Sequence, residues 1–244
     1  MPQGMSRERI AGIVAVTIAL LAVAAPLLAP PPDFGFLKKL GITGGREALP
    51  IDVGLGVPQV LSIPVTYNGS FSGPAALEID AQSSIVLLQE GGREINVVVR
   101  GGHDYSVSES GGKIKVSASS VVVVVTAPRG SLDSVSLKLM SSLVNGSVSA
   151  PLQLRAVSTK FSITLIAGDG SSDLRLSSSA GTLVVVHEPG SGVKLSVSAA
   201  RSVVVVEGEY SRQIVDGHAE IGEGPYTVSI DADNSYLAVR VTGR

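Results

Sequence analysis

Three histidines are the first residues in this 244-residue sequence whose chemistry would suit a metal site or proton transfer. His103, His187 and His218 stand far apart, each on a stretch flanked by Gly or Pro, so no close pair of zinc ligands is present. We therefore expect all three histidines to be surface residues. The sequence predicts no metal site.

Two acidic stretches, residues 169–173 and 231–234, place carboxylate and amide oxygens close together, as Ca²⁺ requires. Neither completes an EF-hand loop, because the Gly at position six and the Glu at position twelve do not follow the second stretch. Asp and Asn also form tight turns through their own side chains. We expect ordinary turns here, with ion binding as the alternative.

Four glutamates near the carboxyl end could supply an acid and a base for glycoside hydrolysis. They are Glu207, Glu209, Glu220 and Glu223. However, aromatic residues are only 4% of the chain, which disfavours a sugar-stacking platform. Serine is abundant, but no Gly-x-Ser-x-Gly motif is present, and the chain has no Cys for nucleophilic or thiolate chemistry. We expect a non-enzymatic protein without a cofactor and keep a carbohydrate-active domain as an alternative.

The overall composition disfavours one class of partner. The net charge is -2 and the chain has few rings on which bases stack, so we expect no nucleic-acid partner. Charged residues are 16% of the chain, below the roughly 25% of an average domain. Short strings of apolar residues alternate with Ser, Gly and Asn, and this pattern is typical of an all-β protein.

The amino-terminal part of the chain resembles a membrane anchor. Residues 1–9 carry basic charge and are expected to be cytoplasmic, and residues 10–29 are uncharged. At about 1.5 Å per residue, that stretch spans roughly 30 Å, the hydrocarbon thickness of a bilayer. We expect a retained signal anchor in the cell membrane, with a single pass and the carboxyl-terminal domain outside. A cleaved signal, which would give a secreted protein, and a pilin-like leader are alternatives.

Residues 30–74 are rich in Pro and Gly and are expected to form a stalk with one possible edge strand at 51–65. If residues 51–65 instead paired with a neighbouring copy, the protein would be a filament or pilus-type subunit built by strand donation. Asn68 and Asn145 each begin an Asn-Gly-Ser sequence, which is a glycosylation acceptor pattern or simply a Gly-containing turn.

From residue 75 to 244, apolar strings recur about every twenty residues or a multiple of that interval, as in repeat proteins. One set alternates inward Leu or Val with outward polar residues, as at 135–139 and 174–176. We predict a single-stranded parallel β-solenoid, similar to a β-helix, with a β-sandwich as the alternative.

The other set of strings lies at 121–125, 162–166, 183–186 and 203–206. The strings 121–125 and 203–206 are valine throughout, which places apolar side chains on both faces of their strands. If these strings stack, they form an apolar outer stripe. The predicted stripe consists of Val121, Val123, Val125, Val184, Val186, Val204 and Val206, with the alternate positions of the same strings as the alternative, because a valine string does not show which parity faces outward.

The chain at this point resembles the putative-adhesin family of domains of unknown function, which are envelope-associated parallel β-solenoids. The resemblance covers about residues 75–244 and rests on strings such as 76–80, 95–99 and 123–128, with 226–230 and 237–241 resembling the family's last coil and cap. It implies no catalytic residue. We therefore expect a cell-surface protein for adhesion or envelope scaffolding, with self-association, an envelope protein or a glycan as partner.

Overall fold

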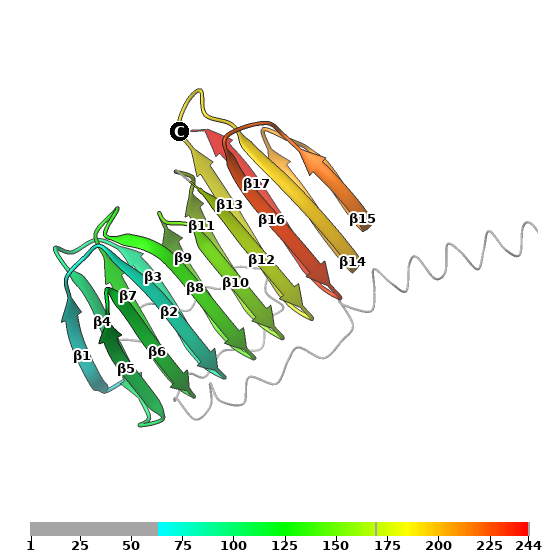
Figure 1. The fold of residues 1–244 in the computed structure, drawn as a ribbon. Coiled ribbons are helices and arrows are strands. Elements are labelled where there is room, and N and C mark those ends of the chain that lie inside the picture. The colour runs from blue at the N-terminus through cyan, green and yellow to red at the C-terminus, as the bar shows by residue number, and fades with distance from the viewer. Residues whose placement is uncertain (1–62, 169, 244) are drawn as a thin grey trace, which may run out of the picture. The chain divides into compact units, whose positions relative to one another are not determined.

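The structure is a computed structural model that describes residues 63–168 and 170–243. Every regular element in this part is a β-strand, so the all-β prediction is confirmed (Figure 1). The predicted membrane segment 10–29 and most of the stalk lie outside the described residues. Among the residues that are described, no helix is long and apolar enough to cross a bilayer.

Seventeen strands follow one another along the described part of the chain, most of them six to ten residues long. They are β1 (Val65–Phe71), β2 (Ala75–Gln82), β3 (Ile85–Glu90), β4 (Ile95–Gly101), β5 (Tyr105–Ser110), β6 (Lys113–Ser119), β7 (Val121–Ala127), β8 (Leu132–Met140), β9 (Leu143–Val148), β10 (Leu152–Val157), β11 (Lys160–Ile166), β12 (Ser171–Ser177), β13 (Ala180–His187), β14 (Val193–Gly208), β15 (Arg212–Ile221), β16 (Tyr226–Asp233) and β17 (Tyr236–Gly243).

One set of strands, which we call the first layer, pairs in parallel in the order β6, β2, β8, β10, β12, β16 and the first half of β14. Residues twenty positions apart face each other across β10 and β12, where Leu154 pairs with Leu174. Figure 1 shows β2, β8, β10, β12 and β16 side by side.

A second layer pairs in parallel in the order β7, β3, β9, β11, β13, β17 and the second half of β14. Antiparallel strands flank the ends of both layers: β4 and then β1 lie beside β7, β5 lies beside β6, and β15 lies along both halves of β14. Such strands cover hydrogen-bonding edges that would otherwise attract another chain.

The order of the strands in space differs from their order in the sequence. β2 and β3 are nearer the middle of their layers than β6 and β7, although they come earlier in the sequence. β16 lies between β12 and the first half of β14, and β17 lies between β13 and the second half of β14. The strings at 226–230 and 237–241, which resemble a last coil and cap, are therefore internal. The two halves of β14, together with β15, form that end of the two layers instead.

A regular corner joins each first-layer strand to the second-layer strand that follows it. The corner residue adopts a left-handed conformation, with φ between 48° and 56°, at Ser83, Ser120, Ser141, Ser158, Ser178, Arg201 and Asn234. Except after Ser120, the next residue is a buried Ser or Thr whose hydroxyl donates to the carbonyl two residues earlier.

These buried hydroxyls also connect neighbouring corners. The Thr159 amide donates to the Ser179 hydroxyl, the Ser179 amide to that of Ser235, and the Ser235 amide to that of Ser202. The corner amides, which leave the regular strand pairing, are thus satisfied inside the protein. A part of the Ser and Thr content of the chain thus serves the corners of the fold.

One contiguous core lies between the two layers, because alternate residues of every paired strand point inward. Leu137, Leu154 and Leu174 from the first layer and Ile163 and Leu183 from the second are at most 1% exposed. The burial pattern of β8 and β12 confirms the predicted alternation of inward Leu or Val with outward polar residues.

Candidate functional site

The outward face of the first layer carries an open groove of about 430 Å³. Polar and charged side chains from the adjacent strands β6, β2, β8 and β10 line it, together with a few apolar residues of the same strands. The polar lining comprises Glu78, Lys113, Ser134, Ser136, Lys138, Gln153 and Arg155. The groove therefore combines cations with hydroxyl and amide groups that form hydrogen bonds in either direction.

Glu78 lies between two lysines from the strands on either side of it. It pairs with Lys113 of β6 and with Lys138 of β8, whose Nζ lies 3.2 Å from Glu78 Oε1. The hydrogen bonds from Lys113 and then Lys138 lower the pKa of Glu78 to about 2, against the opposing effect of burial. Glu78 is thus a carboxylate under all ordinary conditions and holds both lysines over the groove.

A row of cations crosses the groove and continues beyond it. Lys138, Arg155 and Arg175 occupy equivalent positions on β8, β10 and β12, so their side chains share one face of the sheet. Asp80 precedes Lys138 in this row, and Asp231 follows Arg175. Alternation along each strand predicts that these residues face outward, but only the strand register reveals that they are neighbours.

The predicted valine stripe requires a correction. Val121, Val123, Val125, Val204 and Val206 are at most 2% exposed and belong to the core, so they cannot form an outer stripe. Val184 and Val186 do face outward and are half-buried. A valine string has no alternation in residue type, so its sequence does not reveal which members point inward.

Other apolar side chains of the second layer do face outward. They occupy the positions next to the inward-facing residues of the same strings. Val122, Ile85 and Leu143 form a row across β7, β3 and β9 and are buried outside the shared core. Ile63 is also buried, and its carbonyl accepts a hydrogen bond from Arg100, the partner of Val122 on β4.

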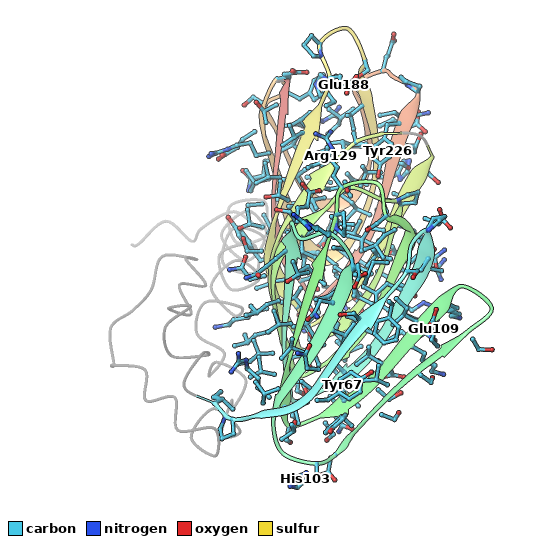
Figure 2. The ribbon with its side chains drawn as sticks, turned by 90° about the vertical axis from the view of Figure 1, so that its left-hand side faces the viewer. Tyr67, His103, Glu109, Arg129, Glu188 and Tyr226 are labelled. Carbon is cyan, nitrogen blue, oxygen red and sulfur yellow. The ribbon has the colours of Figure 1, made fainter. Side chains whose placement is uncertain are left out.

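The three histidines do not come together, but they differ in environment. His103 and His218 are exposed, as expected. His187 is only 6% exposed, which corrects the expectation that it is a surface residue. Figure 2 shows His103 and Glu188, the neighbour of His187, at opposite ends of the view. Within residues 63–168 and 170–243, no group of three or more potential ligands is positioned to hold a metal ion.

The acidic stretches and glutamates are mostly engaged in ion pairs. Asp233 contacts Arg201 at 2.6 Å, and both Asp231 and Asp233 belong to β16 rather than to a turn. Glu207, in the second half of β14, pairs with Arg240. Glu220 of β15 pairs with Lys194, which is in the first half of β14. These glutamates therefore lie on different layers. Asp169 lies outside the described residues.

Both glycosylation acceptor patterns lie within strands rather than turns. Asn68 is exposed on the edge strand β1, where its side-chain oxygen accepts a hydrogen bond from Asn96. Asn145 is half-buried in β9 between two parallel neighbours. The turn interpretation is wrong at both positions. Most of the predicted donor segment 51–65 lies outside the described residues, and Val65 pairs with Arg100 of its own chain.

No protein-family model and no curated protein matches this chain. Several solved structures are similar to this chain, including three at low identity. A putative cell adhesion protein from Clostridium sporogenes has 9% identity over 73% of this chain and 99% of its own, with a TM-score of 0.47. Putative adhesins from Bacteroides fragilis (11% identity, 72% and 96% coverage, TM-score 0.28) and Parabacteroides merdae (10%, 71% and 94%, 0.25) are also similar.

Proposed function

We propose that this chain is a non-enzymatic, membrane-anchored protein of the cell surface that acts in adhesion or envelope scaffolding. Its described part would be a short parallel β-solenoid, an assignment supported by the parallel pairing of strands in both layers. The amino-terminal segment 10–29 would hold it in the membrane, with the β domain outside; a secreted form remains the alternative.

The observation that carries this proposal is the in-register row of outward side chains on the first layer. Asp80, Lys138, Arg155, Arg175 and Asp231 lie on five consecutive strands. Neighbouring strands are about 4.8 Å apart, so the row presents a series of charged groups along a flat surface. A surface of this kind suits an extended partner that makes many weak contacts at once.

Attachment of whole cells tests the proposed function. Cells that produce the full chain should adhere to isolated envelope material more than cells that produce residues 1–62 alone. Because both forms keep the amino-terminal segment, the difference measures the contribution of the β domain. Equal attachment by the two strains would contradict the proposal.

Membrane anchoring requires a separate test. If residues 10–29 form a retained anchor, the full chain should stay in the membrane fraction after a carbonate wash, and protease added to intact cells should digest its β domain. Release into the medium of a chain that has lost its amino-terminal apolar segment would instead establish the secreted alternative.

A further inference from the structure

We propose that the cation row centred on Arg155 binds a linear anionic polysaccharide through the acidic groups of its sugars. This inference rests on the proposed surface function, for which it names the chemistry of the partner. The groups concerned are Lys138, Arg155 and Arg175, with the polar lining of the adjacent groove.

The charge arrangement of the row is the first argument. Like charges directly opposite one another on a sheet are destabilising, yet three cations occupy adjacent strands at a spacing of about 4.8 Å. The outer two have acidic partners: Lys138 pairs with Glu78 at 3.2 Å, and Arg175 pairs with Asp173 at 3.1 Å. The repulsion is therefore least compensated at the centre, where an external anion would be stabilised most.

Arg155 itself is the second argument. It is exposed, and its side chain forms no hydrogen bond or ion pair with any residue in the described part of the chain. Its neighbours across the sheet are Lys138 and Arg175, and its neighbours on the same face of β10 are Gln153 and Val157. The planar guanidinium is thus free to bind a carboxylate or sulfate through two parallel hydrogen bonds.

The groove explains why a glycan fits better than other polyanions. Ser134, Ser136 and Gln153 offer hydrogen bonds to neutral hydroxyl groups, and the Glu78 carboxylate disfavours a chain with dense charge. None of the described residues that line the groove is aromatic, so it has no platform for nucleic-acid bases. A glycan that alternates charged and neutral groups matches this mixture.

An exposed apolar pair borders the cation row. Met140 and Val157 face each other on β8 and β10, directly after Lys138 and Arg155 on the same face, and are 46% and 45% exposed. Sugar rings have apolar C–H surfaces, which would pack on these side chains while the acidic groups reach the cations. The surface therefore offers both components that a charged sugar requires.

Binding measurements with the full chain in detergent test this inference. The immobilised probes are polygalacturonate, which carries carboxylates, dextran sulfate, which carries sulfates, and neutral dextran. We expect the chain to bind at least one charged polymer, to bind no neutral dextran, and to lose affinity as salt concentration rises. The preferred polymer identifies the acidic group.

Substitutions locate the binding site on the surface. We expect Arg155→Gln to weaken binding at least tenfold and Arg155→Lys to weaken it less, because lysine keeps the charge and loses the paired hydrogen bonds. Arg212→Gln is the matched control, since Arg212 is an exposed arginine on β15, away from the groove. Far-ultraviolet circular dichroism should show that all three variants keep their strand content.

Three results would overturn the inference. They are no binding to either charged polymer, equal losses for Arg155→Gln and Arg212→Gln, and equally tight binding of duplex DNA with the same dependence on Arg155. The cell-attachment assay separates this failure from that of the proposed function. Attachment without glycan binding would refute only the inference, and glycan binding without attachment would refute only the function.

Discussion

The carboxylate of Glu209 accepts a hydrogen bond from Nε2 of His187 at 2.9 Å, although the two residues are 22 positions apart in the sequence. His187 ends β13, whereas Glu209 follows β14, and β17 lies between these strands. The same carboxylate accepts the amide hydrogen of Gly243 on β17 at 2.8 Å. One side chain thus links three neighbouring strands of the second layer.

Both ring nitrogens of His187 face acceptors, since Nδ1 lies 3.0 Å from the carbonyl oxygen of Glu188. Only the protonated ring can donate from both nitrogens. The Glu188 carbonyl and then the Glu209 carboxylate raise the pKa of His187 above 6.5, against the opposing effect of burial. In an NMR titration of the ring proton signals, we expect a pKa above 6.5 that falls in Glu209→Gln.

This raised pKa makes stability depend on pH. Because the folded form binds the proton more tightly than the unfolded form, His187 contributes its full stabilisation below about pH 6.5 and loses it as the pH rises through the folded-state pKa. Denaturant unfolding of the full chain at several pH values should show this decline. His187→Gln should lack it, whereas His218→Gln, at an exposed histidine, should retain it. A decline that persists in His187→Gln would refute the assignment.

The ion pairs of Glu78 predict the opposite dependence at acid pH. The pKa of Glu78 is lowered from 4.5 to about 2, so its stabilisation is present above pH 4.5 and is lost as the pH falls towards 2. We expect Glu78→Gln to remove this part of the acid sensitivity. Glu109→Gln, on the exposed strand β5, is the control and should behave like the unaltered chain.

Removal of a corner hydroxyl should destabilise the fold. Ser179 accepts the Thr159 amide hydrogen at 3.2 Å and donates to the carbonyl of Ser177 at 2.9 Å. Ser179→Ala leaves the buried Thr159 amide without this partner, and we expect the free energy of unfolding to fall by about 1–3 kcal/mol. Ser106→Ala, at an exposed serine, should change it by less than about 0.5 kcal/mol. Similar losses for both variants would show that the corner hydroxyls are dispensable.

Gly181 provides the space for Phe161, the largest fully buried side chain among the described residues. It lies opposite Phe161 in the register of β11 and β13, and a Cβ at Gly181 would lie 2.5 Å from the Phe161 ring. We expect Gly181→Ala to lower the free energy of unfolding by about 1–3 kcal/mol through overpacking.

The double variant Phe161→Leu with Gly181→Ala tests the cause of that loss. The smaller leucine makes room for the new methyl group, so the double variant should be more stable than the sum of the two single changes predicts. Strictly additive losses would show that the two positions act independently.

The sequence predicted side-chain direction well where residue type alternates. Leu137 and Leu154 are buried while Lys138 and Arg155 are exposed, as the pattern indicates. It failed in the valine strings, because inward and outward positions are there occupied by the same residue type. It also placed His187 on the surface, because nothing near His187 in the sequence indicates the contact with Glu209.

By itself, the sequence determined that the described part is all-β and which residues of the alternating strands face inward, because both depend on preferences that act within a few residues. Tertiary structure alone decided which strands are neighbours. It placed β16 and β17 inside β14, aligned Lys138, Arg155 and Arg175 in one row, and brought Glu209 to His187. These relationships depend on pairing between segments that are distant in the sequence. The pairing is set by how whole strands bury their inward faces together, so no short stretch of sequence reveals it.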